Sequence, residues 1–140
     1  MKNWFLVLAI VSATLIVGCS SSGAGGSGGS SGGFDYKEVV LNTDYPNETI
    51  NAEGFRDFTF VAGSNASHTI ALTNLGSDVD WYLYDDQGNA DTLSFPIFES
   101  MTLSTVDETN TVSLSPGNRY WLVVEEWDSI NSSFDLRISN

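Results

Sequence analysis

Residues 78–85 read Asp-Val-Asp-Trp-Tyr-Leu-Tyr-Asp, an alternation that is typical of a β-strand with one buried face. The alternation predicts that Val79, Trp81 and Leu83 face a hydrophobic core, while the residues between them face the opposite side of the sheet. Residues 85–89 include a glycine and follow as a predicted turn. This stretch therefore indicates an all-β fold.

Short alternating runs of the same kind lie on both sides of this stretch. Within residues 34–140 we find no apolar stripe with the 3.6-residue period of an amphipathic helix. Pro96 argues against a central strand in residues 92–108, where we expect a short edge strand at 101–104. About seven or eight short strands separated by turns predict an antiparallel β-sandwich. The other predicted strands cover residues 38–41, 57–62, 68–73, 109–114, 119–127 and 133–139.

The composition excludes several classes of protein. The chain has 140 residues and a net charge of −13, from 18 acidic and 5 basic side chains. This balance argues against nucleic-acid binding, which requires a basic surface. Since the chain has one cysteine and one histidine, it can form neither an internal disulfide nor a multi-histidine metal site. The length and the 41% hydrophobic content fit one folded domain.

The N-terminal segment has the features of a bacterial lipoprotein signal. Residues 4–17 are almost entirely apolar but are shorter than the roughly 20 residues of a membrane span. The residues that lead into Cys19, Leu-Ile-Val-Gly, resemble the lipoprotein cleavage box. The resemblance implies a signal peptide over residues 1–18, lipidation of Cys19 with acyl chains such as palmitate, and, because Ser20 follows, the outer membrane. An ordinary signal peptide that contains a cysteine is the alternative.

Residues 19–33 are predicted to tether a folded domain to this anchor. After Cys19, this segment holds only serine, glycine and one alanine, so it has no apolar surface to bury. We therefore divide the chain into a signal peptide at 1–18, the lipidated cysteine with a flexible linker at 19–33, and a β-sandwich domain at 34–140.

Four segments of the sandwich, in order, resemble the bacterial pre-peptidase C-terminal domain. Residues 56–63 read Arg-Asp-Phe-Thr-Phe-Val-Ala-Gly, and residues 78–85 are similar to that family's Asp-x-Asp-Leu-x-Leu-Tyr-Asp strand. Residues 112–124 contain an apolar strand, a Pro-Gly turn and a Tyr-Trp-Leu-Val-Val strand, and residues 134–138 read Phe-Asp-Leu-Arg-Ile. The resemblance implies a jelly-roll-like β-sandwich without a catalytic role, of the kind that accompanies secreted hydrolases.

We do not expect the chain to be an enzyme. His68 is its only histidine, and we expect this residue at an exposed strand end. Within residues 34–140, the predicted domain, no Gly-x-Ser-x-Gly nucleophile motif is present, and Cys19 is assigned to the lipid. The preferred prediction is therefore a lipid-anchored module that binds an extracytoplasmic protein or peptide. A purely structural envelope lipoprotein is an alternative.

The resemblance also implies a calcium site, because the collagen-binding relatives of this family bind calcium. They use an acidic-Pro-Asn segment and an aspartate at the start of the first core strand. The matching residues here are Asp44, Asn47, Glu48 and Asp57. The alternative is that Asp44 and Asn47 form an Asx turn around Pro46.

A second acidic group is expected near one end of the sandwich. Carboxylates are the ligands that calcium prefers, so Asp78 and Asp80 are further candidates. The alternative is that these side chains only keep loops solvated and protect a sheet edge. The group consists of Asp78, Asp80, Asp85, Asp86 and Asp91.

Aromatic residues predict a rival function. Tyr82 and Tyr84 alternate with the core-facing residues and therefore point outward, and Trp121 and Trp127 are placed on the outside as well. A row of outward rings can stack on sugars, so these four residues predict a carbohydrate-binding surface as the alternative to protein or peptide binding. Cross-strand aromatic pairing, or a second covered face of the sheet, would explain the same pattern.

Overall fold

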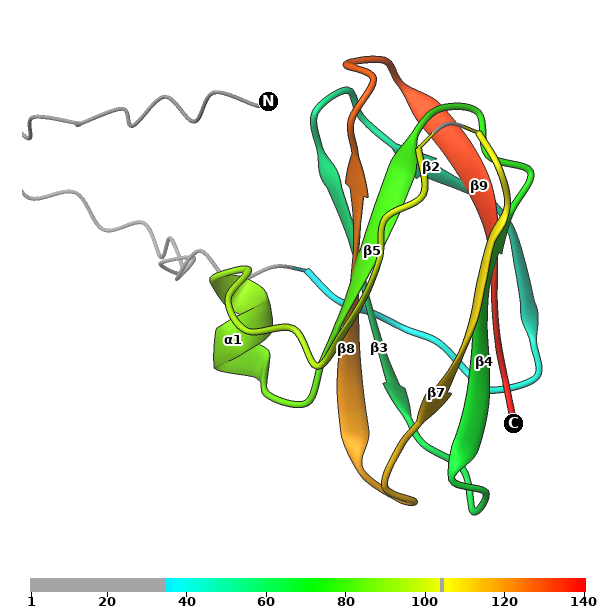
Figure 1. Ribbon diagram of the computed structural model, residues 1–140, viewed down its shortest axis with the longest axis vertical. Coiled ribbons are helices and arrows are strands. Elements are labelled where there is room, and N and C mark those ends of the chain that lie inside the picture. The colour runs from blue at the N-terminus through cyan, green and yellow to red at the C-terminus, as the bar shows by residue number, and fades with distance from the viewer. Residues whose placement is uncertain (1–34, 104) are drawn as a thin grey trace, which may run out of the picture. The chain divides into compact units, whose positions relative to one another are not determined.

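The computed structural model describes residues 35–103 and 105–140, which form two facing β-sheets (Figure 1). The five-stranded sheet has the order β1-β3-β8-β5-β6, and the four-stranded sheet has the order β2-β9-β4-β7. β1 runs parallel to β3, and the other described pairs are antiparallel. The predicted β-sandwich is confirmed. Its strands are β1 Lys37–Glu38, β2 Asp44–Ile50, β3 Phe55–Val61, β4 Ser67–Thr73, β5 Val79–Tyr84, β6 Phe98–Ser100, β7 Glu108–Ser113, β8 Arg119–Glu126 and β9 Ser132–Ser139.

β5 forms over the residues that the alternation predicted, and its inward side chains are the expected ones. Val79, Trp81 and Leu83 are fully buried. In the register with β8, Trp81 lies opposite Val124 and Leu83 opposite Leu122. Since side chains on one face of neighbouring strands contact each other, this pairing builds the centre of the core.

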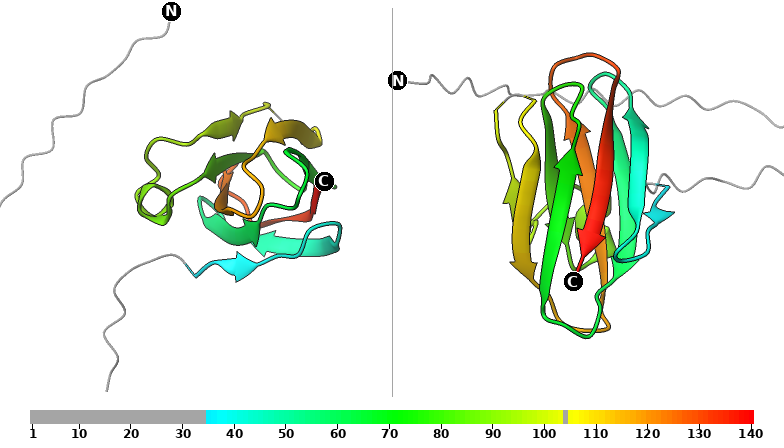
Figure 2. Two further views of the ribbon diagram at one scale, coloured as in Figure 1. Left: turned by 90° about the horizontal axis from the view of Figure 1, so that it is seen from below. Right: turned by 90° about the vertical axis from the view of Figure 1, so that its right-hand side faces the viewer.

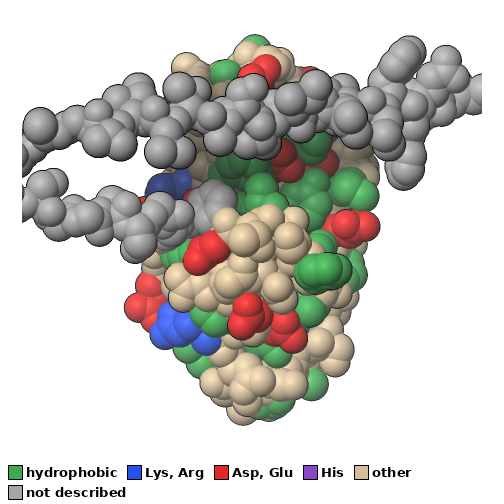
Figure 3. Space-filling view, turned by 90° about the vertical axis from the view of Figure 1, so that its left-hand side faces the viewer, with side chains coloured by type: hydrophobic (Ala, Val, Ile, Leu, Met, Phe, Trp, Pro, Cys, Tyr) green, Lys and Arg blue, Asp and Glu red, His purple; other side chains and the backbone are tan. Residues whose placement is uncertain are grey.

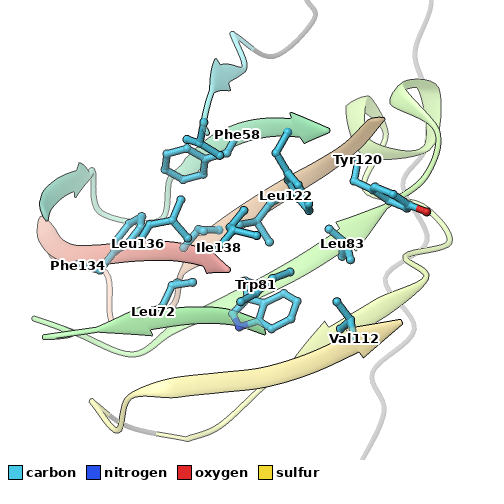
Figure 4. Packing of buried hydrophobic residues seen from close by; sticks show 14 of the residues in the cluster. Phe58, Leu72, Trp81, Leu83, Val112, Tyr120, Leu122, Phe134, Leu136 and Ile138 are labelled. Atoms are coloured by element: carbon cyan, nitrogen blue, oxygen red, sulfur yellow. The ribbon is translucent and has the colours of Figure 1, made fainter. Parts of the chain in front are cut away.

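The core lies between the two sheets (Figure 4). Phe58 from β3 and Phe134 from β9 meet edge to face, with their ring centroids 6.2 Å apart. The Trp81 ring stacks on Phe98 at 5.3 Å. Burial of each large apolar side chain contributes roughly 1.5–3 kcal/mol to stability. The fully or almost fully buried apolar residues include Phe58, Phe60, Ile70, Leu72, Trp81, Leu83, Leu122, Phe134, Leu136 and Ile138.

The sequence did not predict β2, which pairs with β9 along one edge of the four-stranded sheet. Its register shifts between Tyr45 and Glu48, so the strand contains a β-bulge. The bulge accommodates Pro46, which cannot donate a ladder hydrogen bond, and Asn47, which has a φ of 55°. The Asp44 side chain forms an ion pair with Arg137 on the neighbouring strand. Residues 44–48 are therefore an irregular edge strand.

Two further elements differ from the prediction. The expected turn at residues 85–89 is replaced by a short helix, α1, over Gln87–Asp91. Asp86 caps this helix, because its carboxylate accepts a hydrogen bond from the backbone N–H of Asn89 at 3.0 Å. The edge strand β6 lies at Phe98–Ser100, just before the expected residues 101–104. The short β6 begins only after Pro96, which cannot donate a ladder hydrogen bond.

α1 covers part of the outer face of the five-stranded sheet (Figure 2). Ala90 of α1 is buried together with Tyr84 and Val123 of the sheet, and Tyr36, Tyr82 and Trp121 pack against them. This sheet is therefore buried on both faces over part of its area, which the alternation in β5 alone does not reveal. In the described part of the chain, no helix has the length and apolar character needed to span a membrane.

Candidate functional site

A pocket of about 330 Å³ lies on the outer face of the five-stranded sheet, beside the segment that connects α1 to β6. Its volume is at the lower end of the range of about 300–1,000 Å³ that is usual for ligand sites. Figure 3 views the molecule from the side on which α1 lies. The pocket is lined by Tyr82, Tyr84, Leu93, Pro96, Glu99, Glu125 and Trp127.

Neighbouring strands and backbone hydrogen bonds hold these side chains in place. Tyr82 and Tyr84 project from β5 on the face opposite the core. Trp127 follows β8, and its backbone N–H donates to the carbonyl of Asp78 at 3.0 Å, which fixes the residue beside β5. On the other side, the N–H of Ile97 donates to the carbonyl of Leu83 at 2.8 Å and fixes the segment that contains Pro96.

The structure brings three of the four predicted aromatic residues together, but not as a flat platform. Tyr84 is 1% exposed and forms part of the base, whereas Trp127 is 55% exposed at the rim. Trp121 lies opposite Tyr84 in the register and packs against the cluster beneath α1, but it does not line the pocket. The predicted row of outward rings is therefore only partly gathered at this pocket, and carbohydrate binding stays a prediction.

The carboxylates of Glu99 and Glu125 line the pocket, and that of Asp80 lies beside it. Asp80 lies directly opposite Glu125 in the register of β5 and β8, and Tyr82 lies opposite Glu99 on β6. Burial, together with the negative charges of Glu108, Asp78 and Glu125, raises the pKa of Asp80 to about 7. Burial also raises the pKa of Glu125, although a hydrogen bond from the Tyr82 hydroxyl opposes this shift.

The basic side chains of the described residues all form ion pairs away from this pocket. Lys37 and Arg56 both pair with Glu48, Arg119 pairs with Glu38, and Arg137 pairs with Asp44. In the face seen in Figure 3, the basic side chains lie toward one margin and acidic side chains are spread over the rest. Within the described residues, the pocket carboxylates therefore have no cationic partner.

Four lining residues were not predicted. Glu125 could have been found from the sequence, because it alternates with the core-facing Leu122 and Val124 on β8 and so shares the face of Tyr82. No sequence signal identifies Leu93, Pro96 or Glu99, because their position depends on the pairing of β6 with β5.

The residues of the first predicted calcium site are engaged with protein groups. Asp44 pairs with Arg137, and the backbone N–H of Asn47 donates to Asp135 at 2.8 Å. Burial raises the pKa of Glu48, but hydrogen bonds from Lys37 and Arg56 outweigh this effect and leave that pKa lowered. These residues therefore do not fit a calcium site in this arrangement.

Asp57 differs from the other three residues of that predicted site. It is 8% exposed, and its Oδ1 atom has no hydrogen-bond partner. Burial, opposed by Arg56, raises the pKa of Asp57 to about 6. Residues 35–103 and 105–140 contain no group of three or more acidic, histidine or cysteine side chains that could hold a metal ion.

The second acidic group is divided among several roles. Asp86 caps α1, and Asp91 accepts a hydrogen bond from the Tyr36 hydroxyl at 2.8 Å. Asp85 is exposed, and Asp80 lies beside the pocket opposite Glu125. The backbone N–H of Asp78 donates to Asp128 at 2.8 Å. These five aspartates are therefore not gathered into one site.

Melting experiments test whether calcium stabilises the fold, as the sequence resemblance implied. We expect the same melting temperature in EDTA and in millimolar calcium, since ion pairs already neutralise Asp44 and Glu48. Thermal unfolding followed by circular dichroism measures the difference. A rise of several degrees with calcium that disappears in Asp57→Asn would instead support the predicted ligands.

The surroundings of His68 differ from the sequence-based expectation. His68 is fully buried rather than exposed, and its Nε2 atom accepts a hydrogen bond from the N–H of Gly63 at 3.0 Å. The expectation of an exposed strand end is wrong, because the imidazole is enclosed where it holds the turn after β3.

Cys19 lies outside the described residues, so its lipidation stays a prediction.

The fold is similar to a solved structure, the crystal structure of the pre-peptidase C-terminal domain of a collagenase from Bacillus anthracis. The two share 16% sequence identity with a TM-score of 0.55, over 74% of this chain and 94% of that chain. No protein-family model matches the sequence. No curated protein sequence matches it either. The chain therefore has a β-sandwich fold like that of the pre-peptidase C-terminal domain, as the sequence resemblance implied.

Proposed function

We propose that the protein is a non-catalytic binding module of the bacterial cell envelope, held at the outer membrane by lipidated Cys19, and that it captures an extracytoplasmic protein or peptide. The observation that supports this proposal most directly is the convergence of three aromatic and two acidic side chains on one pocket. Aromatic walls with a few polar groups are typical of ligand sites. The anchor rests on the sequence alone.

Exposed apolar side chains beside the pocket favour a protein or peptide as the ligand. Phe95 is 82% exposed, Ile97 46% and Met101 59%, all within the segment that includes the pocket wall. Contiguous exposed apolar residues are typical of protein interaction sites. The pocket would then receive one side chain, while these residues contact the surface around it.

The backbone of the same segment is also consistent with a binding role. Leu93 and Phe95 have φ values of 50° and 55°, in the left-handed region that side chains other than glycine rarely adopt. Such conformations cost about 1–3 kcal/mol each and are concentrated at functional sites. Leu93 contributes directly to the pocket wall, and Phe95 projects into solvent next to it.

Trp127→Ser is the variant that tests the pocket. Peptide ligands are first selected from a random display library against the full chain in mild detergent. We expect Trp127→Ser to weaken the binding of these peptides by about tenfold or more, since buried aromatic contacts dominate such interfaces. Ile130→Ser is the matched control, because Ile130 is 48% exposed, close to the 55% of Trp127, and does not line the pocket. Equal binding by both variants, or the failure of the library to yield any ligand, would contradict the proposal.

Carbohydrate binding is the second candidate, because Tyr82, Tyr84 and Trp127 do line one pocket. Because Trp121 lies outside the pocket and Tyr84 is buried, two of the four predicted rings offer no exposed surface there for stacking on a sugar. Soluble polysaccharides are therefore included in the same assay. Binding of a polysaccharide that Trp127→Ser abolishes, without any peptide ligand, would favour this candidate instead.

A further inference from the structure

Two carboxylates face each other in the register of the sheet, one of them, Glu125, in the pocket and the other beside it. Asp80 on β5 lies directly opposite Glu125 on β8, and Glu99 on β6 lies opposite the adjacent Tyr82. Like charges directly opposite on neighbouring strands destabilise a sheet. The described lysines and arginines are all paired elsewhere, so none of them offsets this repulsion. A ligand that carries positive charge would offset it.

We propose that the pocket recognises a protonated lysine or arginine side chain presented by the peptide or protein ligand. This proposal rests on the proposed function and names the chemical group that enters the site. The carboxylates of Glu99 and Glu125 would accept hydrogen bonds from the cationic head group. The rings of Tyr82, Tyr84 and Trp127 would contact its charge and its aliphatic stem.

The chain itself contains the same arrangement with a cation in place. Lys37 lies over the Tyr45 ring, with its Nζ atom 5.0 Å from the ring centroid, and pairs with Glu48. Arg56 lies 5.5 Å from the centroid of the Phe58 ring and pairs with the same carboxylate at 2.9 Å. An aromatic ring beside a glutamate thus holds a basic side chain twice in this fold. The pocket offers the same groups with no described cation.

The charge of the whole protein supports the same ligand. A net charge of −13 attracts basic partners and repels acidic ones at long range. The pocket adds a specific site to this attraction, because its volume suits a single side chain. A neutral sugar would leave the repulsion between Asp80 and Glu125 in place.

Short peptides that differ at one position test this proposal. The probes are acetyl-Leu-Xaa-Leu-amide with lysine, arginine or norleucine at the middle position, titrated into the full chain in mild detergent. The readout is the NMR signal of the Trp127 indole N–H, at the pocket rim. We expect the lysine and arginine peptides to bind at least about tenfold more tightly than the norleucine peptide. We also expect about 0.5 M salt to reduce this difference.

Two charge variants form the matched pair for this experiment. Glu99→Gln removes an exposed carboxylate from the pocket, whereas Asp85→Asn removes an exposed carboxylate that does not line it. We expect only Glu99→Gln to weaken binding of the lysine peptide. Equal binding of the lysine and norleucine peptides would overturn the cation proposal and leave the proposed peptide-binding function intact. A Trp127 shift with polysaccharide and with none of the peptides would overturn both.

Discussion

Trp81→Ala is expected to lower the free energy of unfolding by about 3–5 kcal/mol, which is a large part of the roughly 5–15 kcal/mol that holds a domain folded. Trp81 is fully buried at the centre of β5, and its ring stacks on Phe98 at 5.3 Å. Alanine would leave a large cavity between the two sheets and deprive β6 of its main core contact. Urea unfolding followed by circular dichroism measures the loss.

Trp81→Phe separates ring packing from the polar atom of the indole. The Nε1 atom of Trp81 is buried without a hydrogen-bond partner, which costs about 1–3 kcal/mol. Phenylalanine removes this donor and keeps a ring against Phe98, so we expect a stability within about 1.5 kcal/mol of the wild type. Equal damage by Trp81→Phe and Trp81→Ala would contradict this expectation, because it would show that a smaller ring at this position does not preserve the packing against Phe98. The exposed Trp127 provides the control, since Trp127→Ala should change stability by less than about 0.5 kcal/mol.

Glu126→Gln is the second substitution with a large expected effect, a loss of about 1.5–3 kcal/mol at pH 7. Glu126 is 2% exposed, and its two carboxylate oxygens accept hydrogen bonds from the backbone N–H groups of Glu53 at 2.9 Å and Asp128 at 2.8 Å. These bonds tie the loop before β3 to the loop after β8. The glutamine amide would place N–H groups against one of these donors and leave it without an acceptor.

The neighbouring Glu125 is the matched control, because the two pKa shifts have opposite directions. Burial raises the pKa of Glu126, but backbone hydrogen bonds leave it lowered below its usual 4.5, so its contribution is present above pH 4.5 and is lost as the pH falls through the folded-state pKa. Burial raises the pKa of Glu125, so its charge destabilises the fold at neutral pH. Glu125→Gln should therefore be neutral or stabilising at pH 7.

Urea unfolding at pH 7 and below pH 4 measures both variants. The difference between the wild type and Glu126→Gln should decrease at the lower pH, because the glutamate is then partly protonated as well. A difference that is the same at both pH values would contradict the role of the charge. A loss of stability in Glu125→Gln similar to that in Glu126→Gln would show that the buried hydrogen bonds are not the cause.

Local alternation was sufficient to identify the fold class and the inward face of the core strands. Val79, Trp81 and Leu83 were predicted to face the core and are fully buried, because a β-strand places alternate residues on opposite faces whatever its neighbours are. β2 was missed because its bulge and Pro46 break the alternation, and its ladder depends on β9, far along the chain.

The candidate site was predictable only in part for the same reason. Tyr82, Tyr84 and Trp127 were predicted from their alternation and their place at a strand end, and they do line the pocket. The pocket itself requires α1 to cover part of the sheet and β6 to pair beside Tyr82. Neither contact has a local pattern, since both depend on which segments meet after folding.

The sequence by itself determined the all-β class, the core-facing residues and the acidic character of the protein, because alternation and composition are local properties of the chain. The tertiary structure alone decided which charges meet. It pairs Glu48 with two cations and sets Asp80 opposite Glu125 without one. Strand register controls these contacts, and register is established by the packing of the whole sandwich rather than by any one segment.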